Sequence, residues 1–215
     1  MSATSNLRDF KLDRRVLMLS AVSLVIGAGG AGLAVVLSKL IGLMTNLFYF
    51  HRVGFALVSP ANTPLGPVRV LIPVAGGLMV GLMARYGSDK IRGHGIPEAM
   101  EAILLRGAKV EPKLAILKPI SAAIAIGSGG PFGAEGPIIM TGGAFGSLVA
   151  QALHLTDNER TVLLVAGAAA GMSATFAAPF AAVLLAVELL LFEWRPRSLV
   201  PVVVASVMAG ILRML

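Results

Sequence analysis

The stretch Gly133-Ala134-Glu135-Gly136-Pro137 carries the only acidic side chain between Lys118 and Asp157. An ionisable group inside a long apolar segment is costly to bury, and for that reason such residues are usually functional. Proline in the first turn favours a helix start, and the flanking glycines leave backbone N–H groups open to approach. Because a helix N-terminus attracts anions, the stretch predicts an anion site beside a functional carboxylate.

The composition around this stretch predicts an all-α membrane protein that crosses the bilayer several times. Hydrophobic residues make up 56% of the 215-residue chain, charged residues make up 13%, and the mean hydropathy is +0.85. A soluble domain carries about twice that charged fraction. Some uncharged runs are long enough to span a bilayer as helices, and shorter ones indicate broken or half-depth helices. Apart from Glu135, these runs are Val16–Ser38, Val70–Ala84, Pro119–Thr156, Thr161–Val187 and Ser198–Leu212.

The net charge of +7 is explained by lysine and arginine at the ends of the apolar runs, as expected of short cytoplasmic loops. Residues 1–15 are therefore predicted to be a cytoplasmic segment of a multi-pass protein of the cell (inner) membrane. There is no basic stripe with interleaved aromatic residues, which argues against a nucleic-acid partner. The chain has no cysteine, and its histidines show no metal-binding spacing, so we expect no metal and no cofactor.

Full spans should alternate with short segments that glycine and proline interrupt, which indicates a binding site of discontinuous helices near the membrane midplane. Tyr49 is expected to mark a membrane interface, and Thr156 with Glu159 reads as a capping box. A helix break is expected at Gly171. The expected helices are Arg15–Phe50, Val68–Tyr86, one from about Pro97 to Arg106, one ending at Ile126, Pro137–His154, Asp157–Ala170, Pro179–Trp194 and Ser198–Leu215.

Glycines recur three and four residues apart, as at Gly142, Gly146, Gly167 and Gly171, a spacing that lets membrane helices approach closely. The match of residues 27–32 to G-x-G-x-x-G is interpreted in the same way. A dinucleotide fold would need an acidic residue about 20 positions later, and none occurs between Asp13 and Asp89. No nucleophile with a base at motif spacing occurs either, so an enzyme is not expected.

A second helix start framed by glycine and proline is Gly93-His94-Gly95-Ile96-Pro97-Glu98. His94 is either an ordinary polar interface residue or a donor to an anion. The acidic residues Glu98 and Glu101 are explained by the positive end of the helix dipole. Further along, Glu188 is either a buried, paired carboxylate or part of an ion or proton pathway.

The two helix starts, G-x-G-I-P-E and G-x-E-G-P, lie about 40 residues apart in a polytopic chain and resemble the CLC family of chloride channels and chloride/proton exchangers. The block from Gly167 to Pro179, followed by Glu188, is similar to the next characteristic block of that family. The resemblance runs from about Gly76 to the C-terminus. It implies one half of the inverted-repeat CLC fold, with broken and half-depth helices.

The resemblance implies that Glu135 is the gating glutamate, which competes with chloride for the outer anion site. The implied anion-binding residues are His94, Gly95, Ile96, Gly133, Ala134, Glu135 and Gly136. His94 replaces a frequent serine and Ala134 a common lysine or arginine. Exchangers tend to have a second glutamate directly after the position of Glu188, and here that residue is Leu189. The implied function is gated, channel-like chloride permeation, with Glu188 in a possible proton pathway.

Residues 1–215 resemble only the N-terminal half of the CLC transmembrane domain, and the second half's G-x-F-x-P helix start and chloride-coordinating tyrosine are missing. We therefore expect that anion permeation needs a second half of the fold. The resemblance also implies a homodimer formed through the last two helices. Two alternatives stay open: a proton-coupled chloride or fluoride antiporter of the same fold, and a non-conducting, truncated membrane scaffold.

Overall fold

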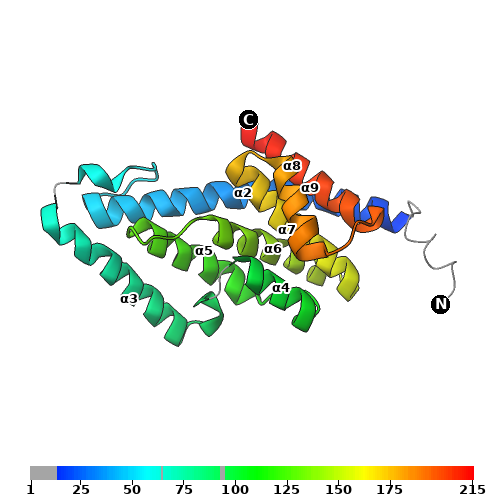
Figure 1. Ribbon diagram of the computed structural model, residues 1–215, viewed down its shortest axis with the longest axis horizontal. Coiled ribbons are helices and arrows are strands. Elements are labelled where there is room, and N and C mark those ends of the chain that lie inside the picture. Colours follow the sequence, from blue (N-terminus) through cyan, green and yellow to red (C-terminus); the bar gives the residue numbers. More distant parts are fainter. Residues whose placement is uncertain (1–13, 64, 93–94) are drawn as a thin grey trace.

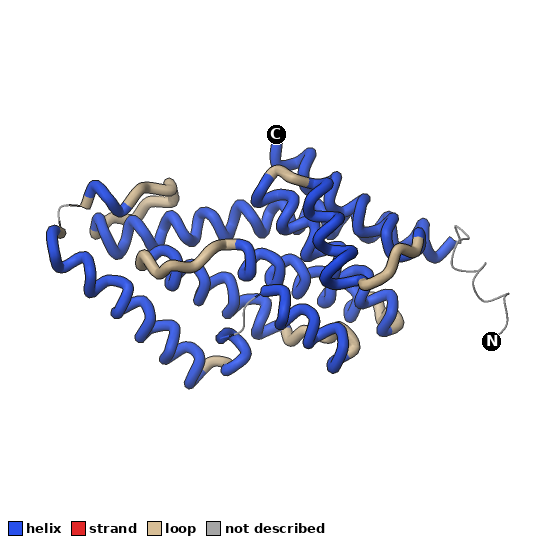
Figure 2. The backbone as a smooth tube through the Cα atoms, in the orientation of Figure 1, coloured by secondary structure: helices blue, strands red, loops and turns tan. Residues whose placement is uncertain are grey.

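The described part of the chain is helical throughout and contains no strand (Figures 1 and 2). The computed structural model describes residues 14–63, 65–92 and 95–215, so most of the predicted cytoplasmic segment lies outside it. The α-helices are α2 (Arg14–Phe50), α3 (Leu71–Tyr86), α4 (Gly95–Arg106), α5 (Pro112–Gly127), α6 (Glu135–Ala152), α7 (Asp157–Phe176), α8 (Pro179–Ala186) and α9 (Pro196–Met214). The short turns are η1 (Pro60–Asn62), η2 (Gly66–Val70), η3 (Asp89–Arg92) and the π-helical η4 (Val187–Leu191).

Three helical segments of the described chain are long and apolar enough to cross a membrane: Arg14–Phe50, Gly66–Tyr86 and Pro196–Met214. The first of these, α2, runs along the long axis of the molecule in Figure 1, and α5, α6, α7 and α9 pack against it. The prediction of an all-α chain with apolar spanning helices and shorter interrupted ones is confirmed.

Helix α7 forms the centre of the core, between α6, α9 and α2. Its buried face consists largely of alanine and glycine, which lets the neighbouring backbones come close. A Cβ atom at Gly167 would overlap the carbonyl oxygen of Gly142, and one at Gly146 would overlap that of Leu163. The close α6–α7 packing predicted from the glycine spacing is therefore confirmed.

The glycines of α2 serve the same purpose. A Cβ atom at Gly27 would lie 2.6 Å from the carbonyl oxygen of Ala205 in α9, and one at Gly30 would lie 2.7 Å from Cβ of Ala170 in α7. The G-x-G-x-x-G match in residues 27–32 is thus a helix-packing surface, as expected.

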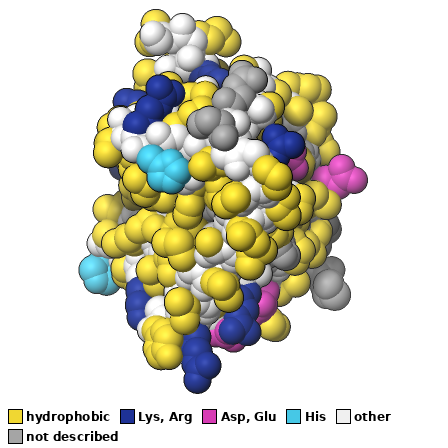
Figure 3. Space-filling model, turned by 90° about the vertical axis from the view of Figure 1, so that its left-hand side faces the viewer, with side chains coloured by type: hydrophobic (Ala, Val, Ile, Leu, Met, Phe, Trp, Pro, Cys, Tyr) yellow, Lys and Arg dark blue, Asp and Glu magenta, His cyan; other side chains and the backbone are white. Residues whose placement is uncertain are grey.

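Helix α3 stands apart from this core and contacts mainly α5 and the short turns η2 and η3 on either side of it. Most of its large hydrophobic side chains are exposed, among them Val74, Leu78 and Leu82. Figure 3 views the molecule from the end that carries α3 and shows many hydrophobic side chains on this face. Exposed apolar surface of this extent is suited to lipid or to further protein.

Several helix boundaries differ from the sequence expectation, and three of them affect the site or its surroundings. Helix α7 continues through Gly171, because the missing side chain makes room for the backbone of Ile138 in α6 without disturbing the helix. The break comes instead at Ala177, which has a left-handed φ of 54° and precedes Pro179. Helix α6 begins at Glu135, so that Pro137 lies within its first turn. The last predicted inner helix ends at Leu191 instead of Trp194, because Phe192 is left-handed.

The side chain of Tyr49, the residue expected to mark a membrane interface, is buried within the protein. It is 5% exposed, and its hydroxyl donates to the carbonyl oxygen of Ser128 at 2.9 Å, which ties the end of α5 to α2. The capping box is confirmed: the Thr156 hydroxyl accepts from the Glu159 backbone N–H at 3.4 Å, and the Glu159 carboxylate accepts from the Thr156 backbone N–H at 3.0 Å.

We predict that Gly167→Ala lowers the free energy of unfolding by about 1–3 kcal/mol, because the new methyl group would push α6 away from α7. The matched control is Gly32→Ala in α2, where nothing lies within 4 Å of the added methyl group. That control should change the stability by less than about 1 kcal/mol, and towards greater stability. Denaturation in detergent micelles measures both, and equal effects would contradict the packing role of Gly167.

Candidate functional site

The starts of α4 and α6 lie against each other. Gly95, the first residue of α4, has φ +48°, and a Cβ atom there would overlap Cα of Gly136 in the first turn of α6. Only glycine fits a positive φ together with such an approach at little cost. The two helix starts that the sequence singled out are therefore brought to one place.

A cavity of about 880 Å³ opens beside these helix starts. Gly95, Ile96 and Pro97 from α4 and Glu135, Gly136 and Pro137 from α6 line it, and α3, α5, α7 and α8 complete its wall. The wall is mostly apolar. Few polar groups reach it, as is usual for small-ligand sites, in which a small number of placed polar groups fix the ligand.

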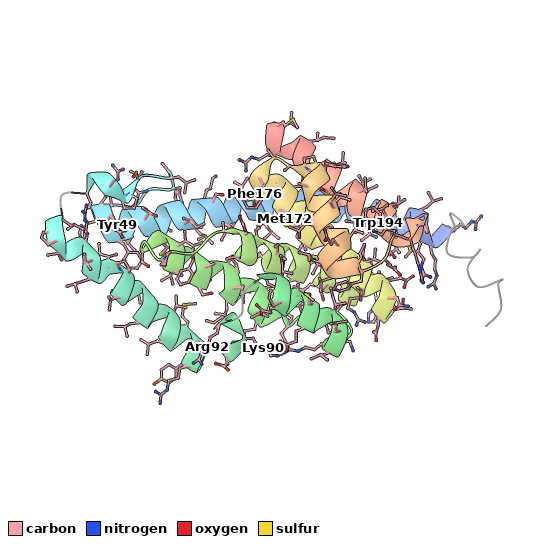
Figure 4. All side chains as sticks on the ribbon, in the orientation of Figure 1. Tyr49, Lys90, Arg92, Met172, Phe176 and Trp194 are labelled. Atoms are coloured by element: carbon pink, nitrogen blue, oxygen red, sulfur yellow. The ribbon has the colours of Figure 1, made fainter. Side chains whose placement is uncertain are left out.

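Two of the larger side chains in the wall are Met172 and Phe176, in the last turns of α7 (Figure 4). They are there because α7 runs on past Gly171 to Phe176 before the chain turns at Ala177. Helix α8 then starts at Pro179 and returns along the cavity, with Ala181 in the wall. The uninterrupted α7 thus places an apolar residue, Phe176, in the cavity wall.

The first backbone N–H groups of α6 are unpaired among the described residues. Its N-cap residue, Ala134, has no side chain that can accept from them, and the first helical hydrogen bond runs from Ile138 N–H to the Ala134 carbonyl oxygen at 3.0 Å. Within the described residues, the N–H groups of Ala134, Glu135 and Gly136 donate to no other group. Unpaired amides at a helix N-terminus bind anions.

Glu135 is the first residue of α6 and lines the cavity. Its side chain is exposed and makes no hydrogen bond or ion pair with another described residue. A carboxylate beside unpaired amides, with nothing to hold it, has room to change position. The acid and the helix start that the sequence singled out thus lie together at the cavity, with the carboxylate next to the unpaired amides.

The burial of Lys118 was not among the expectations from the sequence. This lysine lies in the middle of α5, its side chain is 6% exposed, and it lines the cavity. Its ammonium group pairs with Glu98 of α4. Glu98 thus has a buried cationic partner besides the helix dipole. The apolar run Leu114–Leu117 immediately before Lys118 was the signal that this lysine belongs to a buried helix.

The structure brings together Gly95, Ile96, Gly133, Glu135 and Gly136, which all line the cavity. Ala134 is adjacent to it as the N-cap of α6. His94 lies outside the described residues.

Glu188 lies away from the cavity, on the π-helical turn η4. The buried positions of this region are Ala182, Val183, Ala186, Val187 and Leu190, and Glu188 is on the opposite, exposed face. Among the described residues, its carboxylate has no hydrogen-bonding or ionic partner. Within the described residues Glu188 is therefore exposed and unpaired, and its role in a pathway stays a prediction.

The part of the chain that the structure describes contains no cluster of three or more histidine, cysteine, aspartate or glutamate side chains that could hold a metal ion. Charge in the cavity wall comes instead from Glu135, Lys118 and Arg92. The arrangement is suited to holding a small anion through backbone amides, with one acid and buried positive charge nearby.

Comparison with known proteins gives a consistent result. The family model "Voltage gated chloride channel" matches residues 76–215. The voltage-gated ClC-type chloride channel ClcB of Citrobacter koseri is 31% identical over 201 residues, which are 91% of this chain and 46% of the relative. The H(+)/Cl(-) exchange transporter ClcA of Vibrio vulnificus is 30% identical over 198 residues, which are 81% of this chain and 41% of the relative.

A solved structure described as a slow cyanobacterial Cl⁻/H⁺ antiporter has the same fold over 94% of this chain and 47% of its own, with a TM-score of 0.67 at 22% identity. The chain thus spans less than half the length of these curated relatives and of this structure.

We predict that Gly95→Ala separates the two helix starts and lowers the stability of the intact protein by about 1–3 kcal/mol. Gly133→Ala is the control, because the nearest atom to its added methyl group is 4.0 Å away and its φ is not left-handed. Thermal unfolding in detergent measures both variants. A Gly95→Ala protein as stable as the Gly133→Ala protein would show that the close approach is not needed.

Proposed function

Because the chain belongs to the voltage-gated chloride channel (CLC) family, we propose that it forms part of a membrane pathway for chloride or a similar small anion, gated by Glu135. The proteins that it resembles are channels and transporters, which supports transport in place of enzymatic catalysis. Three helices of spanning length support an integral membrane location. We place the protein in the cell (inner) membrane with a cytoplasmic N-terminus, because Arg14 and Arg15 open the first span.

The observation that carries this proposal is the meeting of two helix starts at one cavity, with a free carboxylate on one of them. Helix N-termini and backbone amides offer partial positive charges without a full countercharge. Such a site binds an anion strongly enough for entry and weakly enough for exit. Gly95, Ile96, Gly133, Ala134 and Gly136 are the proposed anion-binding positions, together with His94.

The proposed gating mechanism follows from the position of Glu135. When ionised, its carboxylate is itself an anion beside the unpaired amides of α6 and competes with chloride for them. Protonation removes the charge, so the side chain loses that attraction and leaves the site to the permeating ion. Anion flux should therefore rise as the solution becomes more acidic.

We predict that Glu135→Gln in the intact protein raises chloride flux at neutral pH and flattens its dependence on pH. Glutamine has nearly the same shape as glutamate but cannot compete as an anion at any pH. Chloride efflux from proteoliposomes, followed from about pH 8 down to about pH 4, measures both effects, because an ordinary glutamate carboxyl titrates towards the acidic end of that range.

Glu101→Gln is the matched control for this experiment, because Glu101 lies on α4 in an exposed ion pair with Arg106 and does not line the cavity of the helix starts. It should leave both the flux and the pH profile as they are in the wild type. If Glu135→Gln responds to pH as the wild type does, Glu135 is not the gate.

We propose that the pathway also involves protein beyond residues 1–215. Glu135 and Phe176 line the cavity yet stay exposed, and α3 has an exposed apolar surface. We propose that a second half of the fold covers these groups. We propose in addition that a homodimer forms through the last two helices, α8 and α9, since Phe180, Val207 and Ile211 are exposed there.

A proton-coupled antiporter of the same fold is the second candidate. It is favoured by the similarity to a H(+)/Cl(-) exchange transporter of Vibrio vulnificus. Against it stands Leu189, a residue that cannot carry a proton at the position where exchangers tend to have a second glutamate. The two candidates differ in whether chloride movement drives proton movement.

We predict that a chloride gradient across proteoliposomes drives no uphill proton movement through the wild-type protein, because Leu189 interrupts the proton route. A pH-sensitive dye in the vesicle lumen measures this. Uphill proton movement that Glu188→Gln abolishes would instead establish the antiporter and assign Glu188 to its proton pathway. Repeating the assay with fluoride in place of chloride tests the choice of anion.

A further inference from the structure

The buried ion pair between Lys118 and Glu98 joins two walls of the cavity. The Lys118 ammonium group, in the middle of α5, pairs with the carboxylate of Glu98 in the first turn of α4. It also donates to the carbonyl oxygens of Lys90 and Ile91 in η3, each at 3.3 Å. One side chain thereby holds both η3 and the start of α4 against α5.

A second, more exposed ion pair also holds η3 against α5. Lys90 of η3 pairs with Glu111, the N-cap residue of α5, and this hydrogen bond and charge lower the pKa of the Glu111 carboxyl. Figure 4 shows Lys90 near Arg92 on the turn between α3 and α4. The start of α4 is thus tied to α5 at the middle of that helix and, through η3, at its beginning.

The ion pair is oriented with respect to the cavities on either side of it. Lys118 lines the cavity of the helix starts, whereas Glu98 lines a separate cavity of about 650 Å³. Lys118 therefore belongs to the wall of the proposed anion site, whereas Glu98 belongs to the wall of the other cavity. A purely structural contact would not need charges here, because apolar residues of similar volume often pack as well as a buried ion pair.

We propose that Lys118 is a positioning residue for the start of α4 and that its pairing with Glu98 sets the anion affinity of the cavity. Lys118 supplies a buried full positive charge to a site whose other positive groups are the partial charges of the helix ends and the exposed Arg92. Glu98 partly neutralises that charge, and the bound anion can therefore still dissociate. This inference rests on the proposed anion pathway and adds to it the residues that tune binding.

The test compares four forms of the intact protein in proteoliposomes: wild type, Glu98→Gln, Lys118→Met, and the double variant. Glu98→Gln should lower the KM for chloride about tenfold and slow the maximal flux, and Lys118→Met should raise the KM about tenfold. These changes are those expected for one unbalanced charge on the order of 10 Å from the anion at an effective dielectric constant of about 20. The double variant should return to within about threefold of wild type, since its net charge is again balanced.

The exposed pair Glu101–Arg106 on the same helix provides the control, and Glu101→Gln and Arg106→Met should leave the KM unchanged. Lys118→Arg, which keeps the charge, should keep the KM near that of wild type. If Lys118→Met does not fold, Glu98→Gln and Lys118→Arg still decide the matter, since both keep a buried cation.

Shifts of the KM in the same direction for both single variants, or a Glu98→Gln protein with wild-type KM, would overturn the role of the pair while leaving the pathway intact. A wild-type protein that carries no chloride under the same conditions would instead overturn the proposed function, and with it the tuning role.

Discussion

The close approach of Gly95 to Gly136 is the constraint on which the candidate site depends. Two helix starts that are distant in the sequence can share one cavity only if no side chain stands between them. With Cβ atoms at this contact, the helices would have to move apart, and the cavity would lose one of its two positive helix ends. Glycine at the start of α4 meets both demands, since it also accepts the left-handed φ found there.

The packing of α6 against α7 holds α6 in the position that brings Gly136 against Gly95. Gly142, Gly146 and Gly167 bring the two backbones together, and a rigid α6 then presents its N-terminus at a defined place. The same small residues let α7 continue without a break to Phe176, which enters the cavity wall. Close backbone packing in the core and the shape of the site are thus consequences of one pattern of small side chains.

Charge in the site is arranged in layers. The first turn of α6 has unpaired amides, Glu135 in that turn lines the cavity without a partner among the described residues, and Lys118 lines the cavity from α5 while pairing with Glu98 of α4. Partial charges in an apolar setting hold an anion without a salt bridge that would trap it. In the proposed pathway the full charges provide the control: the Glu135 carboxylate acts as the gate, and Glu98 moderates the effect of the Lys118 ammonium group.

The sequence by itself determined the helical class, the two helix starts, the glycine packing and the place of Glu135, because these follow from local backbone preferences and from the cost of charge in apolar segments. Only the tertiary structure decided that Lys118 is buried against Glu98, that Glu188 is exposed and that Gly171 lies within a helix. Whether a side chain is buried, and against which partner, depends on helices distant in the sequence. Local backbone preference does not depend on those distant helices, so only their packing in the folded protein determines burial and pairing.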